Sequence, residues 1–223
     1  MLDHVALWVA DRDELAAFLC SHLGMHEIER TDAFTLVGSD ARLGKLTLFA
    51  AEGPRAPGAL ARVVLRVSDL DAALRALPAG LAVDREHNGA ARFEGPQRLG
   101  LGLVADPAPA VEYDIDHVVL RTSDLDATFA ALAELGFAAD GDGLEAGDKR
   151  VVLEHGDPRA ERPLLNHIAL LVDSGRAKIE EAERRGLEIS DVRDTANTFA
   201  VFVRGPEGIE IEYVEHKPTF SLT

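Results

Sequence analysis

The sequence contains a single cysteine, Cys20, among 223 residues. One thiol cannot form an internal disulfide framework, and by itself it cannot build a thiolate metal site. Basic residues are also scarce, with 23 Lys and Arg against 39 Asp and Glu and a formal net charge of -16. Because binding to phosphates requires a basic surface, this charge argues against nucleic acid as a partner. Cys20 is interpreted as a core residue rather than a functional thiol.

Long apolar runs are missing as well. No run approaches the roughly 18 residues of a membrane-spanning helix, and the first residues, MLDHVALWVADRDE, become charged too early for a signal peptide. Lys and Arg are scattered, so no basic cluster indicates a membrane surface. We therefore expect a cytoplasmic protein with no membrane partner. With 47% hydrophobic residues, the chain can still bury a sizeable core.

What the chain does have is an internal repeat. The segment VVLRVSDLDAALRAL at 63–77 returns as VVLRTSDLDATFAAL at 118–132, with eleven of fifteen positions identical. Weaker copies open at His4 and His167. The repeating unit therefore starts near residues 4, 62, 117 and 167, and four modules of about fifty residues fill the chain.

Each module has the same order of elements. A short apolar run such as 118–120 has the length of a strand and stops at a polar cluster that can begin a helix. In two modules Ser68 and Ser123 open an S-x-x-D spacing that is typical of a helix cap. Glycine-punctuated segments and further short runs then indicate an antiparallel set of strands. The sequence predicts four βαβββ modules.

Proline-rich segments mark the junctions between modules. The one at 106–109 lies between the second and third copies of the repeat. It is expected to divide the chain into an N-terminal pair of modules, residues 1–107, and a C-terminal pair, residues 108–223.

These features resemble the vicinal oxygen chelate superfamily, which includes glyoxalase I, bleomycin and fosfomycin resistance proteins, methylmalonyl-CoA epimerase and extradiol dioxygenases. The resemblance covers nearly the whole chain. It rests on the four modules, the H-[VI]-x-L strand openings, the phrase FLCSHLGM in the first module and the ending GPEGIEIEY. It implies an α+β fold in which paired modules form two half-barrel, cup-shaped mixed sheets, with a divalent metal inside a cup. A four-module chain looks most like the extradiol dioxygenases.

Two histidines and one glutamate are the expected metal ligands. His117 and His167 occupy the same position in modules 3 and 4, and because side chains alternate across a strand, both should face the cup. Glu212 lies four residues after Gly208, where the resemblance places the carboxylate ligand of the family. This donor set suits Fe(II), with Mn(II), Ni(II) or Zn(II) as alternatives.

The N-terminal half has His4, Arg62 and Gly102 in the corresponding positions. Arginine is not a ligand and glycine has no side chain, so this half is predicted to bind no metal. Glu154 is a candidate fourth ligand, because it resembles the second carboxylate of glyoxalase I. A one-residue shift in register would turn it outward and bring in His155.

Three further residues are candidates for contact with a substrate. Arg193 and Phe202 stand where extradiol dioxygenases have an acid-base histidine and a tyrosine. Arginine stays charged and is a poor proton shuttle, and phenylalanine cannot donate a hydrogen bond. Arg121 lies four residues beyond His117 and matches a position that binds the substrate carboxylate in glyoxalase I.

The expected function is that of a metal-dependent, dioxygenase-like oxidoreductase acting on a small substrate with vicinal oxygens. One alternative is a glyoxalase- or epimerase-type isomerase or lyase working through a metal-stabilised enediolate, which the missing acid-base residues favour. The other is a non-catalytic protein that binds a small drug molecule, for which metal ligands are unnecessary. The protein could also form a homodimer.

Overall fold

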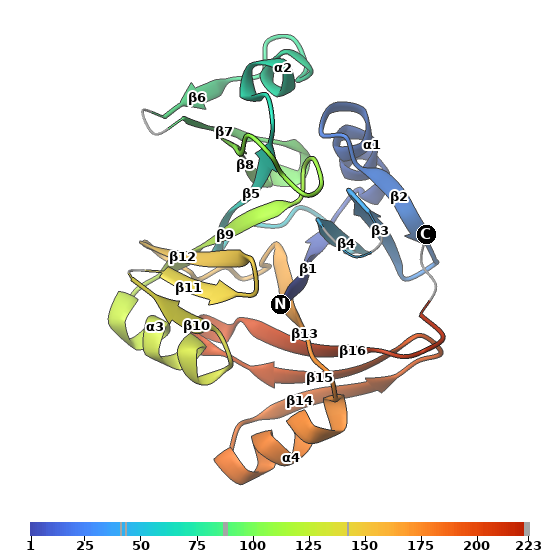
Figure 1. Ribbon diagram of the computed structural model, residues 1–223, viewed down its shortest axis with the longest axis vertical. Helices are drawn as coiled ribbons and strands as arrows, with labels where there is room; N and C mark the ends of the chain where they lie inside the picture. Colours follow the sequence, from blue (N-terminus) through green and yellow to red (C-terminus); the bar gives the residue numbers. More distant parts are fainter. Residues whose placement is uncertain (41, 43, 87–88, 142, 221–223) are drawn as a thin grey trace.

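The computed structural model describes residues 1–40, 42, 44–86, 89–141 and 143–220. These residues form four successive βαβββ modules, as the repeat predicts. The strands make two mixed sheets of eight strands each, and every sheet is shared by two modules (Figure 1). The prediction of an α+β fold with paired modules in two cup-shaped sheets is confirmed.

The first sheet joins module 1 to module 4, in the strand order β14-β15-β16-β13-β1-β4-β3-β2. Module 1 consists of β1 (Leu2–Val9), α1 (Arg12–His22), β2 (His26–Arg30), β3 (Phe34–Gly38) and β4 (Lys45–Ala50). Module 4 consists of β13 (Leu165–Leu171), α4 (Gly175–Arg185), β14 (Ile189–Asp194), β15 (Thr198–Arg204), the short helix η2 (Pro206–Gly208) and β16 (Glu210–His216).

The second sheet joins module 2 to module 3, in the order β10-β11-β12-β9-β5-β8-β7-β6. Module 2 consists of β5 (Leu60–Val67), α2 (Leu70–Arg75), β6 (Val83–Arg85), β7 (Ala90–Glu94), the short helix η1 (Pro96–Arg98) and β8 (Gly100–Ala105). Module 3 consists of β9 (Ile115–Thr122), α3 (Leu125–Glu134), β10 (Ala138–Asp140), β11 (Gly143–Ala146) and β12 (Lys149–His155).

This pairing corrects the expected division into 1–107 and 108–223. The modules meet through their first strands, with β1 antiparallel to β13 and β5 antiparallel to β9. Modules 1 and 2 therefore lie in different sheets, and so do modules 3 and 4 (Figure 1). The reason is that the first strand of every module offers the same kind of open edge, so similarity between modules does not specify which edges pair.

Consecutive modules still contact each other, through the turn that precedes the last strand of modules 2 and 4. In η1, the side chain of Gln97 accepts hydrogen bonds from the backbone N–H groups of Ala10 and Asp11, at the start of α1. In η2, Glu207 accepts hydrogen bonds from the backbone N–H and the hydroxyl of Ser123, just before α3. Helix N-termini favour such acceptors because their first N–H groups lack intrahelical partners.

The helix caps differ in one detail from the expectation. The N-cap residues of α2 and α3 are Asp69 and Asp124, each one position after the expected Ser68 and Ser123. Both aspartates have extended backbones, and each side chain accepts a hydrogen bond from a backbone N–H three residues further on. A carboxylate also interacts favourably with the positive end of the helix dipole.

A continuous cluster of buried apolar side chains extends through both sheets and beneath the helices. The helices lie on the outside of the sheets in Figure 1. Among the residues that the structure describes, none of these helices has the length and apolar character needed to traverse a bilayer. The cup of the first sheet, by contrast, has a buried polar cluster where β1, β13 and β16 meet.

Candidate metal centre

His4, His167 and Glu212 converge in the first sheet, with one ligand atom of each within 4.8 Å of the others. The Nε2 atoms of the two histidines are 3.1 Å apart. Glu212 Oε2 lies 2.8 Å from the Nε2 of His167 and 3.3 Å from that of His4. Within the described residues this is the one group of three or more His, Cys, Asp or Glu side chains with the spacing of a metal site.

The strand register places these side chains together. His4 on β1 pairs with Ala169 on β13, and Ala169 pairs in turn with Glu212 on β16. His167 pairs with Ala6, two residues from His4 on the same face of β1. The two histidines and the glutamate therefore occupy adjacent positions on the cup face of three neighbouring strands.

The other ring nitrogen of each histidine is held by an oxygen. His4 Nδ1 lies 2.8 Å from Asp3 Oδ2, and His167 Nδ1 lies 3.0 Å from Asn166 Oδ1. A carboxylate or amide oxygen only accepts, so each Nδ1 carries a proton and donates it. Each ring therefore directs its Nε2 towards the cluster, and in the neutral form this nitrogen offers a lone pair in the orientation that a histidine ligand adopts.

The ionisation of the cluster follows from this geometry. Burial favours the neutral imidazole, but Asp3 and Glu212 outweigh it and raise the pKa of His4 to about 9. Burial lowers the pKa of His167, and the contact with Glu212 offsets this effect only in part. Burial opposes ionisation of Glu212 as well, yet its contacts with both histidines lower its pKa to about 2. At neutral pH the ionised Glu212 is thus balanced by the protonated ring of His4, whose proton a metal cation would replace.

The residues fit a divalent transition-metal ion. Two lone pairs facing each other at 3.1 Å repel unless a proton or a cation lies between them. Glu212 Oε2 is buried and receives no hydrogen bond of acceptable geometry. Two imidazoles and one carboxylate, each already oriented, are the donor set of a facial two-histidine, one-carboxylate site.

A cavity of about 450 Å³ opens beside the cluster. His167 lies between two aromatic rings, with its centroid 6.3 Å from Phe49 and 5.2 Å from Phe202. Phe34 and Phe220 add to the aromatic wall. The polar side chains of the lining are Asp3, Glu29, Thr31, Lys45, Thr47, Arg193, Thr195, Asn197, Thr198 and His216, besides the cluster itself. The cavity can enclose a small, partly apolar molecule next to the cluster.

The structure brings together two of the three expected ligands, His167 and Glu212, and joins them to His4 instead of His117. The predicted ligand set, confined to the C-terminal half, does not include His4. Arg193 and Phe202 do line the cavity, with the guanidinium of Arg193 5.3 Å from the centre of the Phe202 ring.

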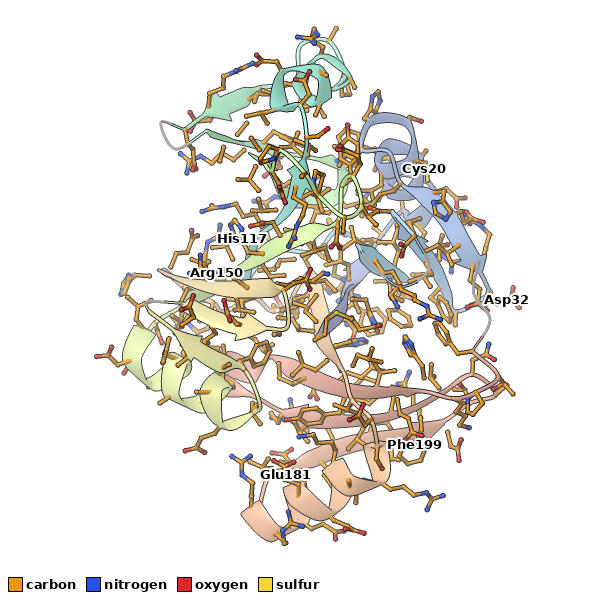
Figure 2. The ribbon with its side chains drawn as sticks, viewed as in Figure 1. Cys20, Asp32, His117, Arg150, Glu181 and Phe199 are labelled. Atoms are coloured by element: carbon orange, nitrogen blue, oxygen red, sulfur yellow. The ribbon has the colours of Figure 1, made fainter. Side chains whose placement is uncertain are left out.

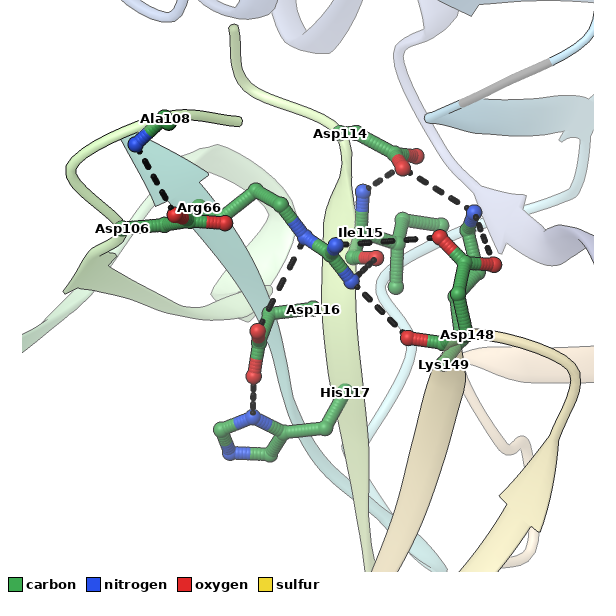
Figure 3. A network of polar contacts seen from close by, with 9 residues as sticks. All are labelled: Arg66, Asp106, Ala108, Asp114, Ile115, Asp116, His117, Asp148 and Lys149. Carbon is green, nitrogen blue, oxygen red and sulfur yellow. Dashed lines mark hydrogen bonds and ion pairs between the residues drawn. The ribbon is translucent and has the colours of Figure 1, made fainter. Parts of the chain in front are cut away.

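His117 lies in the other sheet, next to Arg150 on β12 (Figure 2). Its Nδ1 is 2.7 Å from Asp116, whose carboxylate faces Arg66 at 3.7 Å (Figure 3). Its ring is thus held much as the ring of His4 is held by Asp3. Among the described residues it belongs to no group of three or more His, Cys, Asp or Glu side chains with the spacing of a metal site, so the structure does not bring it together with His167 and Glu212.

Glu154 also lies in the second sheet, which separates it from the cluster. Its two oxygens are each 3.2 Å from a guanidinium, one from Arg62 and one from Arg121. The candidate fourth ligand and the candidate substrate arginine are therefore partners of each other, and neither lines the cavity.

The floor of each cup differs in size. On the face of the cluster, the positions between the ligands are Ala6 and Ala169. The corresponding positions in the second sheet are Val64 and Val119, which pack into a small separate apolar cluster. Branched side chains occupy the space that alanines leave open in the first cup.

Comparison with known proteins agrees with this architecture. Residues 1–142 match the family model of the Glyoxalase/Bleomycin resistance protein/Dioxygenase superfamily. A search of curated proteins gave no match.

Solved structures resemble nearly the whole chain. Glyoxalase I from Zea mays is 16% identical with a TM-score of 0.76, over 96% of this chain and 92% of that one. A putative dioxygenase from Bacillus subtilis is 18% identical with a TM-score of 0.75, over 98% and 86%. The cppA protein from Streptococcus pneumoniae is 15% identical with a TM-score of 0.67, over 96% and 97%. At these identities the likeness establishes the fold alone.

Proposed function

Because the chain belongs to the glyoxalase/bleomycin resistance protein/dioxygenase superfamily, we propose that it is an enzyme whose divalent metal is held by His4, His167 and Glu212. The observation that carries this proposal is the convergence of two Nε2 atoms and one carboxylate oxygen in a buried cup. The proposed reaction is extradiol-dioxygenase-like, on a small substrate with two adjacent oxygens.

Fe(II) suits this donor set best, and Mn(II), Ni(II) or Zn(II) could also be held by it. When bound, the metal supplies open coordination positions for two neighbouring oxygens of a substrate and, for Fe(II), for O2. Asp3 and Asn166 keep the two imidazoles oriented for this role.

The cavity walls select the rest of the substrate. Phe49 and Phe202 flank His167, so a flat apolar ring that reaches the cluster packs between aromatic faces. Arg193 lies over the ring of Phe202, where its charge can attract an anionic substituent.

Isomerase or lyase chemistry of the glyoxalase or epimerase type is the second candidate, and the position of Phe202 favours it. Phe202 contacts His167 directly and has no hydroxyl to donate a hydrogen bond to an oxygen-derived group. The chain has two tyrosines, Tyr113 and Tyr213, and neither lines the cavity. Such an enzyme would remove a proton from, or add one to, the carbon atom next to a carbonyl group, and it would not need O2. Drug sequestration has no comparable support, because it makes no use of a buried ligand set.

Oxygen consumption separates the first two candidates. Protein reconstituted anaerobically with Fe(II) is expected to consume O2 when a catechol is added, and the His167→Ala variant is not. If none of a panel of catechols raises O2 consumption above background, although the protein retains stoichiometric Ni, Zn or Mn, the isomerase function would be favoured instead. Protein that binds none of these metals would refute both.

Metal should also stabilise the folded chain. The cluster joins β1 to β13 and β16, which are far apart in sequence, so the site exists only in the folded state. At a free Zn(II) concentration 100 times the dissociation constant, the free energy of unfolding should rise by about 2.7 kcal/mol. For a chain of this size we expect Tm to rise by roughly 5–10 °C and to return after EDTA treatment. A similar shift in the His167→Ala variant would place the stabilising metal elsewhere.

A further inference from the structure

A third imidazole lines the cavity beside the cluster. His216 ends β16 and lies on the same face of that strand as Glu212 and Val214, all three of which line the cavity. The residues expected to handle protons from the sequence pattern, Arg193 and Phe202, cannot do so. The cavity nevertheless contains a titratable ring that belongs to no ligand set.

The ring of His216 is held in place on two sides. Its Nε2 lies 3.3 Å from Asp3 Oδ1. Its face stacks on Phe220, with the centroids 3.8 Å apart and the planes 5° from parallel. A ring with one nitrogen against a carboxylate and one face covered has little freedom to turn away from the cavity.

The same carboxylate orients a metal ligand. Asp3 Oδ2 contacts His4 Nδ1 at 2.8 Å, and Lys45 Nζ lies 2.9 Å from Asp3. Asp3 is buried, and its ion pair with the buried Lys45 compensates its charge. Asp3 therefore couples the cavity imidazole to the candidate metal centre through one ionised carboxylate.

The tautomer of His216 follows from this contact. An ionised carboxylate only accepts, so the Nε2 that faces it carries a proton. In the neutral ring the basic atom is then Nδ1. Protonation at Nδ1 produces an imidazolium whose charge the adjacent Asp3 stabilises, which is the arrangement of an effective general base.

We propose that His216 is a catalytic residue that accepts the proton of a substrate hydroxyl and later returns it to the product; this inference rests on the proposed function. In this step the substrate O–H bond breaks and an N–H bond forms at Nδ1. The electron pair of the broken bond stays on the substrate oxygen, so that this oxygen becomes anionic. No electrons are exchanged, and no co-reactant is needed.

Other charged groups near His216 do not replace it. Asp3 faces it from β1, and Lys45 from β4 is ion-paired with the same Asp3. Thr198, its register partner on β15, and Phe220 are uncharged. Lys45 therefore acts on the site through Asp3, whereas His216 has a second ring nitrogen, Nδ1, that can accept a proton.

Binding of 4-nitrocatechol to Zn(II)-loaded protein tests the proposal without turnover, because Zn(II) does not activate O2. This probe offers two adjacent oxygens, and its absorption changes when its second hydroxyl ionises. In the wild-type protein, ionisation of the bound probe should occur at lower pH than in His216→Gln by about one unit or more, which corresponds to a tenfold or larger effect. His117→Gln, which alters an aspartate-held histidine in the other sheet, should match the wild type.

Metal content and Tm are measured for every variant, and His216→Asn replaces His216→Gln if the latter misfolds. Equal ionisation profiles in wild-type and His216 variants, with metal and probe still bound, would refute the role of His216 and leave the proposed function intact. Failure of the wild-type Zn(II) protein to bind the probe would instead overturn the proposed function, and this inference with it. If Fe(II)-dependent turnover is present, the His216 variants should lose 10²–10⁴-fold in kcat/KM, mainly through the limb of the pH profile that requires a free base.

Discussion

Substitution of His4, His167 or Glu212 by alanine is expected to abolish stoichiometric metal binding. Each residue contributes one of three converging ligand atoms, and a site left with two protein ligands binds weakly. Residues that only orient a ligand already cost 10–100-fold in affinity when mutated, so we expect roughly 100-fold or more for each ligand. Elemental analysis after dialysis against a defined free-metal concentration measures the loss.

His117→Ala is the matched control, because His117 occupies the repeat position of His4 and is likewise held by an aspartate. It should retain the full metal content. If His117→Ala lost the metal and His4→Ala kept it, the functional cup would be the second sheet. If every variant kept it, the metal would bind outside both cups.

The second large effect concerns folding. Lys149→Met is expected to lower the free energy of unfolding by about 3–5 kcal/mol, because it leaves a buried carboxylate without its cation. Lys149 Nζ lies 3.0 Å from Asp114 Oδ2, and the two side chains are 0% and 2% exposed (Figure 3). The pair joins the start of β12 to the residue before β9. Urea unfolding at neutral pH measures the change.

Arg85→Met provides the comparison, since Arg85 pairs with Asp71 at 2.7 Å on the surface, with the side chains 60% and 63% exposed. Exposed pairs contribute less than about 1 kcal/mol. If the two substitutions cost the same, the Lys149 pair would not depend on burial and our account of it would be incorrect.

The repeat alone allowed the modules, their order of elements and the equivalence of positions to be predicted. Alternation along a strand determines which face a side chain takes, so His4, His117 and His167 could all be assigned to a cup face. The modules and faces depend on local periodicity, which a sequence displays directly. Glu212 was assigned by the resemblance, which implies a carboxylate ligand four residues after Gly208.

The partner of each module could not be derived in this way. The backbone hydrogen bonds between β1 and β13 do not depend on which side chains the strands carry, so the same bonds could have joined β9 to β13. The choice decided whether His4 or His117 completed the cluster. A local signal was present in the alanines at positions 6 and 169, against valines at 64 and 119, because a cup that holds an ion and a substrate needs small residues on its floor.

The sequence by itself therefore determined the four modules and the cup-facing histidines, because these follow from the repeat and from short-range alternation along each strand, while the resemblance implied Glu212. Only the tertiary structure decided that His4 meets His167 and Glu212, that Glu154 is held by Arg62 and Arg121, and that His216 lies in the same cavity. These contacts join strands that are distant in the chain, and they depend on which open edges paired when the two sheets formed.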